Sequence, residues 1–240
     1  MAKTKRRRIR SADWYSISES QWEPLIRRRF PLARLRIVRV RPGTAAYEDV
    51  VALRYAGFVE SGFLDPRRDT RNAMRLPRDE DSIILALYRG HQLLATVTLN
   101  TPTRRFPGMA MELEKHVTID HAYFRDSRAL EITKLVVDPS ARGMRIVLAM
   151  LVVIAFIARI FGKHHLWQVS RDVPADVSWR AGLGFDYSLN VRFRDPALNG
   201  MPSRVGYMHL PTAARDPRVP AFVREIYAGS LGIEAEAARP

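Results

Sequence analysis

The hydrophobic pattern is strongest in residues 131–162. An apolar run at 135–137, ended by Asp138 and the proline after it, predicts a strand with a buried centre. Nearly every side chain from Ile146 to Ile160 is apolar, which predicts a helix buried on most of its surface. Ser140 stands just before this helix and is its expected N-cap.

This strand–turn–helix unit has two consequences. The first backbone N–H groups of the helix point at whatever lies above the end of the strand, and this arrangement favours a phosphate or another anion. The apolar helix is too short for a membrane span, because a span needs about 20 apolar residues. Arginines at positions 145 and 159 also close the apolar run. A core helix is therefore the expectation.

The rest of the chain alternates between strand and helix patterns. Strands are expected at 35–40, 82–88, 92–99, 166–170, 185–193 and 205–210, and helices at 45–60, 176–182 and 222–231. The strand at 166–170 directly follows the long helix, so it should lie parallel to the strand before that helix. Residues 61–79 are expected to form a long loop and residues 100–128 a mixed segment with a short helix. Together these elements predict a mixed α/β domain.

Three regions follow from this reading. Residues 1–33 form a basic N-terminal arm, residues 34–212 the α/β domain, and residues 213–240 a C-terminal helix and tail. Blocks of like charge are usually solvated, so the arm has an ordinary interpretation as an aid to solubility.

Composition narrows the function classes. The chain of 240 residues carries a net charge of +14 and no cysteine. The absence of cysteine excludes disulfides and thiol catalysis and gives no support for secretion. No signal-peptide pattern follows the first basic residues, so we expect a cytoplasmic protein. The charge fits nucleic acid, an anionic membrane surface or an acidic protein, and by itself it does not choose between them.

The usual catalytic patterns are not found in the sequence. The six histidines show no metal-ligand spacing, so no metal site is expected. The sequence also contains no Ser-His-Asp candidate and no glycine-rich nucleotide loop.

The order of elements, with LVVDPSARGMRI at the central turn and WRAGLGFDY later, resembles the GNAT superfamily of N-acyltransferases. The residues that match the family's phosphate-binding turn are Val137, Pro139, Arg142, Gly143 and Ile146. The resemblance implies a GNAT-like α/β fold, with a mixed central sheet that splays at its central strands and is flanked by helices. It also implies that Arg142, Gly143 and Arg145 bind the phosphopantetheine of the acyl donor.

Two departures from the family pattern are informative. Arg145 stands where the family expects a second glycine, and Val147 where it expects glycine or alanine. Side chains at these positions should hinder the close approach of a coenzyme A pyrophosphate to the backbone. One branch of the superfamily takes acyl groups from acyl carrier protein instead, namely the autoinducer (acyl-homoserine lactone) synthases and the long-chain N-acyl amino acid synthases.

The central strand resembles that branch. Its start, Glu131-Ile132-Thr133-Lys134, is similar to the branch's Glu-x-Ser-Arg. Arg54 and Phe58 are similar to its early arginine and aromatic residue, and residues 79–81 to its acidic segment. The tryptophan that follows the early helix in that branch is not evident, so an N-acyl amino acid synthase is favoured over a lactone synthase.

The resemblance and the chemistry of aminolysis assign roles to these positions. Glu131 is the candidate proton acceptor, and a backbone N–H of Val136 or Val137 the candidate donor to the developing oxyanion. The candidates for substrate binding are Arg54, Phe58, Asp79, Asp81 and Lys134, with Arg54 pairing with Glu131 or with an acceptor carboxylate.

Each charged candidate also has an ordinary structural interpretation. Glu131 would then be a surface or strand-end carboxylate paired with Lys134 or Arg128. In the same way Arg54 would lie on a helix surface, and Asp79 and Asp81 in a solvated loop.

The sequence therefore predicts an N-acyltransferase that moves a long-chain acyl group from acyl carrier protein to the amine of an amino acid or a similar small acceptor. No tightly bound cofactor is expected, and acyl-phosphopantetheine or acyl-CoA would be the donor substrate. The alternatives are a conventional CoA-dependent acetyltransferase and a non-enzymatic module that binds nucleic acid or a membrane surface. No nucleic acid partner is expected, whereas a peripheral membrane contact is left open.

Overall fold

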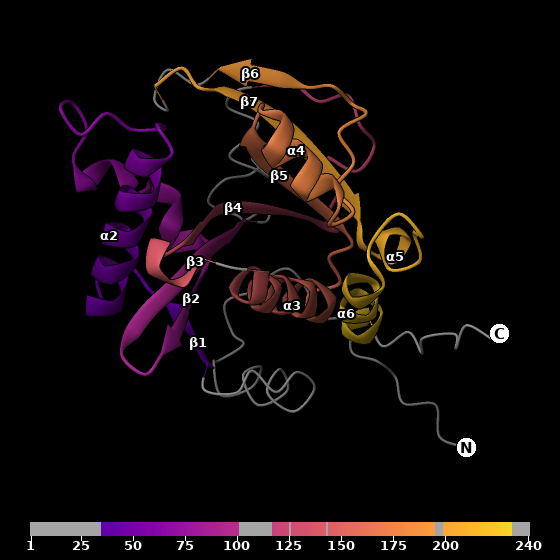
Figure 1. Cartoon of the computed structure of the whole chain (residues 1–240), viewed down its shortest axis with the longest axis horizontal. Helices are drawn as coiled ribbons and strands as arrows, with labels where there is room; N and C mark the ends of the chain where they lie inside the picture. The colour runs from indigo at the N-terminus through magenta and orange to yellow at the C-terminus, as the bar shows by residue number, and fades with distance from the viewer. Residues whose placement is uncertain (1–34, 101–116, 125, 143, 195–198, 232–240) are drawn as a thin grey trace.

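A seven-stranded mixed sheet runs through the computed structural model in the order β1-β2-β3-β4-β5-β7-β6 (Figure 1). The structure describes residues 35–100, 117–124, 126–142, 144–194 and 199–231. The N-terminal arm at 1–33 and most of the C-terminal tail therefore lie outside the described residues. The strands are β1 (Leu35–Val40), β2 (Ile83–Arg89), β3 (Gln92–Asn100), β4 (Ala129–Val137), β5 (His165–Arg171), β6 (Arg192–Arg194) and β7 (Pro202–His209).

Helices cover both faces of this sheet. They are α2 (Ala45–Glu60), α3 (Met144–Ile160), α4 (Pro174–Ala181), α5 (Leu210–Ala213) and α6 (Ala221–Leu231), with 3-10 turns η2 (Arg71–Met74), η3 (Pro77–Asp81) and η5 (Pro139–Ala141). The larger core lies on the face covered by α3, with α6 beside it (Figure 1). The opposite face carries α2 over β1–β3 and the segment 117–124 over β5 and β7. Among the described residues, no helix has both the length and the apolarity that a bilayer crossing requires.

The central strands splay as the sequence predicted. β4 and β5 are the parallel pair, from Ala129 opposite His165 to Ile132 opposite Gln168. Beyond that point β4 continues beside β3, while β5 continues beside β7. The carboxyl-terminal halves of the two strands therefore separate. Both the parallel arrangement and the splay are confirmed.

A β-bulge marks the point where β4 leaves β5. Thr98 pairs with Thr133 and Thr96 with Val136. The two residues of β4 between Thr133 and Val136 therefore lie opposite the single residue of β3 between Thr96 and Thr98. Lys134 lies in the bulge with a φ of 51°. A left-handed conformation is uncommon for a residue with a long side chain. Bulges redirect side chains and end pairing, and they occur frequently beside active sites.

Most of the predicted elements are present within a residue or two, but two expectations are wrong. Residues 185–193 do not form one strand, because only Arg192–Arg194 pair fully and Asp186 makes a single bridge to Tyr207. Ser140 does not cap α3, since it lies in η5 and its N–H donates to Asp138 Oδ1 at 2.9 Å. The short helix expected within residues 100–128 stays a prediction, because positions 101–116 lie outside the described residues.

Helix α2 packs directly on the splayed half of β4. A Cβ built on Gly57 would overlap Cγ1 of Val136, so this helix position has room for glycine alone. The contact fixes the distance between α2 and the strand that carries the candidate oxyanion donors.

Replacing Gly57 with alanine should lower the free energy of unfolding by about 1–3 kcal/mol, the usual cost of overpacking a core. This loss should appear although alanine is a better helix former than glycine. Urea denaturation measures the change, and Val136→Ala in the Gly57→Ala background should recover part of it. A Gly57→Ala variant as stable as the wild type would contradict the close contact.

Candidate active site

A stripe of buried polar side chains runs along β3. Val97 and Leu99 belong to the core under α3, so Thr96, Thr98 and Asn100 face the opposite side of the sheet, toward α2. All three polar residues are almost completely buried. Buried polar groups need hydrogen-bond partners, and the partners of Thr98 and Asn100 define the site.

Glu131 lies next to this stripe on β4. Its side chain is fully buried, and it is opposite Asn100 in the β3–β4 register. Asn100 Nδ2 donates to Glu131 Oε2 at 2.8 Å. The expectation of a surface or strand-end carboxylate is therefore wrong. Arg128, named as a possible partner, bonds to Asp126.

Arg54 and Asp79 form a second buried cluster on the same face. Arg54 on α2 is fully buried, and its guanidinium donates to Asp79 Oδ2 at 2.8 Å and to Thr98 Oγ1 at 2.6 Å. Asp79 also accepts from the Tyr47 hydroxyl at 2.7 Å. Burial and, after it, the hydrogen bond to Asp79 raise the pKa of Tyr47, so this residue stays a neutral donor.

This arrangement corrects two expectations. Arg54 pairs with Asp79 and not with Glu131, and it does not lie on a helix surface. Asp79 is not in a solvated loop, because it belongs to η3 and only 2% of it is exposed. Since the two charges neutralise each other, their first role is to hold α2, η3 and β3 together. Phe58, Asp81 and Lys134 are each half-buried around these clusters.

The backbone of β4 offers a donor toward the splay. Asp138 N–H donates to Leu94 O on β3 at 2.8 Å. Because N–H groups alternate sides along a strand, the N–H of Val136 also faces β3, whereas the N–H of Val137 faces away from it. On that side β5 has already diverged from β4. Of the two predicted donors, Val137 is therefore the one that faces the gap.

The predicted phosphate-binding turn is described only in part. Arg142 is about half exposed and forms an ion pair with Glu60 at the end of α2. Val147 packs against the core under the sheet. Gly143 and the side chain of Arg145 lie outside the described residues. Helix α3 begins at Met144, directly after this turn.

The comparisons with known proteins agree with this geometry. A model of the family described as N-acyl amino acid synthase FeeM matches residues 49–172, just over half of the chain. The chain belongs to this family. The match includes most of α2, the buried Arg54–Asp79 pair, the polar stripe and the whole splayed unit, so this FeeM-family protein is an acyltransferase.

Solved structures show the fold. The structure of FeeM from uncultured soil microbes aligns with a TM-score of 0.53 and 11% identity, covering 75% of this chain and 94% of that one. A spermidine N-acetyltransferase chimera of Vibrio cholerae SpeG and hSSAT aligns with a TM-score of 0.50 and 9% identity, covering 77% and 100%. At such identities the likeness establishes the GNAT fold alone. A comparison with curated proteins found no match.

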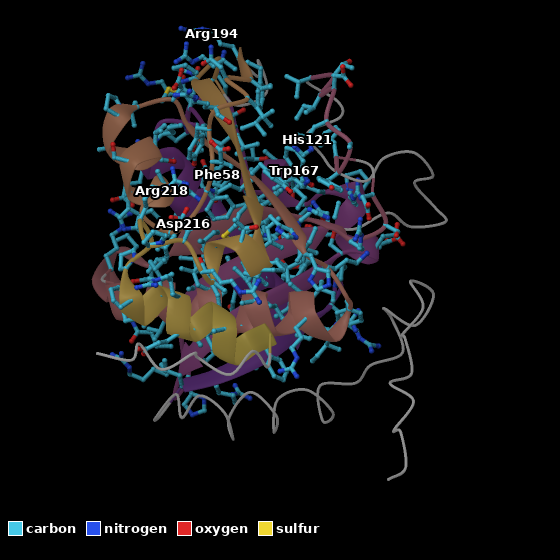
Figure 2. All side chains as sticks on the ribbon, turned by 90° about the vertical axis from the view of Figure 1, so that its right-hand side faces the viewer. Phe58, His121, Trp167, Arg194, Asp216 and Arg218 are labelled. Carbon is cyan, nitrogen blue, oxygen red and sulfur yellow. The ribbon has the colours of Figure 1, made fainter. Side chains whose placement is uncertain are left out.

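An aromatic cluster flanks the site of the FeeM-family enzyme. Trp167 on β5 is fully buried and lies opposite Glu131 in the parallel register. Phe124 meets it edge-on at 5.1 Å, His121 at 5.2 Å, and Tyr207 lies 4.6 Å away. Figure 2 labels Trp167 and His121. These rings lie on the β5 side of Glu131, whose side chain is fully buried. A dry environment strengthens the electrostatic interactions of a carboxylate.

Sequence reasoning missed Tyr47, Ser82, Thr98 and Asn100. The signal for two of them was present, because Thr96, Thr98 and Asn100 alternate with apolar residues along and just after the strand expected at 92–99. Polar residues with period two in a buried strand indicate a polar network. Tyr47 and Ser82 carry no such signal, since their partners lie 32 and 18 residues away.

Proposed function

We propose that this FeeM-family acyltransferase moves a long-chain acyl group from acyl carrier protein to the amine of an amino acid or a similar small acceptor. The observation that carries the proposal is the position of Glu131. This carboxylate is fully buried, is held by Asn100 and lies on β4 just before that strand leaves β5. A buried carboxylate that a neighbouring amide holds in place, close to the point where the sheet splays, suits a proton acceptor.

The reaction balances with the groups at hand. The neutral amine nitrogen attacks the thioester carbonyl carbon, the N–C bond forms and the C–S bond breaks. The amine proton passes to Glu131, directly or through water, and then to the departing thiolate. The negative charge that develops on the carbonyl oxygen is offset by a backbone N–H, for which Val137 is the candidate. Such a donor is fixed in place and needs no reorganisation.

We revise which residues are proposed to bind the acceptor. Arg54 and Asp79 satisfy each other, so we assign the acceptor's amine to Glu131 rather than to Asp79. Asp81 and Lys134 then stay as the candidates for the other polar groups of the acceptor. Phe58, on the helix that packs against β4, is a candidate for its apolar part.

Charge supports the carrier protein as donor. The chain carries a net charge of +14, and an acidic partner would be steered onto such a surface. Arg142 lies directly before α3, where a phosphate is favoured by the first N–H groups of the helix.

Mass spectrometry of reactions with purified protein tests this function. A long-chain acyl carrier protein, the same acyl group on coenzyme A, and acetyl-CoA should be offered separately with a mixture of amino acids. We expect an N-acylated amino acid, formed fastest with the acylated carrier. Equal rates with either CoA thioester would replace the carrier proposal by a conventional CoA-dependent acetyltransferase.

Replacing Arg142 with alanine should raise the KM for the acylated carrier several-fold and change kcat little, because the contact acts mainly in binding. Turnover with the carrier should also fall as salt shortens the Debye length below about 10 Å. Steady-state kinetics at low and high salt measure both effects.

Arg218→Ala is the matched control. Arg218 pairs with Asp216 in the connection between α5 and α6 (Figure 2), so its removal changes the net charge equally at a different place. Equal effects of the two substitutions on KM would contradict a local role for Arg142.

A further inference from the structure

Asn100 donates a hydrogen bond to the buried carboxylate of Glu131. Its Nδ2 lies 2.8 Å from Glu131 Oε2 and 3.5 Å from Thr133 Oγ1, while its Oδ1 lies 2.6 Å from Ser82 Oγ. Only 2% of Asn100 and 5% of Ser82 is exposed. The three side chains therefore form a buried chain that links the start of β2, the end of β3 and the middle of β4.

The chemistry of the groups fixes the direction of this chain. An ionised carboxylate is an acceptor only, so the amide atom at 2.8 Å must be the nitrogen. The amide oxygen then faces Ser82, whose hydroxyl has one proton to donate. Ser82 Oγ also lies 2.8 Å from Arg78 O, a second acceptor for the same proton. The amide orientation thus depends on Glu131 being ionised and on Ser82 donating to Asn100.

We propose that Asn100, oriented by Ser82, is a positioning residue that holds the Glu131 carboxylate ionised and aimed toward the splay between β4 and β5. This inference rests on the proposed function of Glu131 as proton acceptor. Hydrogen bonds to the charged form of a carboxyl favour that form. Asn100 therefore keeps the base ready to accept a proton at neutral pH, in a place where burial alone would favour the neutral acid.

The test follows the ionisation of Glu131 directly. Carbon NMR of protein labelled at the glutamate carboxyl carbon gives one titration curve per glutamate, and Glu131→Gln identifies the curve of Glu131. In Asn100→Leu, which keeps the volume and removes the donor, the midpoint should rise by about one pH unit or more. Ser82→Ala leaves the amide in place but frees it to turn, so it should give a smaller shift in the same direction.

Thr98→Val is the matched control. Thr98 lies on the same face of β3 and bonds to Arg54 rather than to Glu131. This variant loses a buried hydroxyl, as Ser82→Ala does, but should leave the Glu131 midpoint where it is. Among the described residues, the titratable groups on this face of the sheet include Tyr47, Arg54, Asp79, Asp81, His121, Lys134, His165 and Tyr207. These groups are unchanged in all variants. A shift of the Glu131 midpoint that appears only in the Asn100 and Ser82 variants is therefore caused by this hydrogen bond.

Kinetics complete the test. Asn100→Leu should lower kcat for acyl transfer by roughly 10- to 100-fold, the scale of a hydrogen bond to a charged group, with the KM for donor and acceptor little changed. The acid limb of the rate profile should move up with the NMR midpoint.

The outcomes separate the two proposals. An unchanged midpoint in Asn100→Leu overturns the positioning role, whatever the transfer assay shows. Unchanged kcat in a variant whose midpoint has moved overturns it as well. If the wild type transfers no acyl group from any donor, the proposed function fails. The hydrogen bonds from Ser82 through Asn100 to Glu131 then have no catalytic role either.

Discussion

Replacing Glu131 with glutamine should lower the rate of acyl transfer by about 100-fold or more, the usual scale for losing a general base. Glutamine keeps the volume and an acceptor oxygen for Asn100, so the buried hydrogen bond survives. It has no basic site for the amine proton. Single-turnover measurement with the acylated carrier isolates the chemical step from substrate binding and product release.

The control for this variant is Glu48→Gln, which makes the same chemical change in an exposed ion pair with Arg75. The Glu131→Gln enzyme should also unfold at a urea concentration close to that of the wild type. Unchanged turnover across the pH range would remove the proton acceptor role, and a collapse of the fold would point to a purely structural carboxylate.

The second large effect concerns stability. Asp79→Asn and Arg54→Leu should each lower the free energy of unfolding by about 3–5 kcal/mol, because each leaves the opposite charge buried without its partner. The pair lies at 2.8 Å with 0% and 2% of the two side chains exposed. Thr98 and Tyr47 would also lose a hydrogen-bond partner. Urea denaturation followed by circular dichroism measures the loss.

Removing both charges together is the informative control. Arg54→Met with Asp79→Leu should recover part of the loss, since two apolar side chains of similar size leave no unpaired charge. The exposed pair of Glu48 and Arg75 should matter little by comparison. Single variants of Arg54 or Asp79 that unfold like the wild type would show that the pair does not hold α2 to the sheet.

These stability changes bear on function because α2 carries more than Arg54. Gly57 on the same helix lies against Val136, and Phe58 follows it directly. A helix released from η3 and β3 would move away from the splayed half of β4. Loss of the buried pair is therefore expected to reduce activity through the geometry of the site, with the KM for the acceptor rising more than the KM for the donor.

The sequence predicted much of the fold because the spacing of apolar residues, and the buried face that it indicates, can be read within each element. The apolar helix at 146–160 could only be buried, and the strand after it had to return parallel to the strand before it. The hairpin, α2 and the short helices followed from the same periodicities. The strand expected at 185–193 failed because the backbone turns at 187–190, where Asn190 N–H donates to Tyr187 O at 3.0 Å and Asn190 has a φ of 49°.

The sequence predicted which residues belong to the candidate site, but not which of them pair with each other. The sequence by itself determined that Glu131 belongs to the central strand and that charged residues at 54 and 79 precede the hairpin. Only the tertiary structure decided that Arg54 pairs with Asp79, 25 residues away, and that Glu131 pairs with Asn100, 31 residues away. Such pairs depend on strand register and on the bulge at Lys134, which arise from packing across the sheet and leave no period in the sequence.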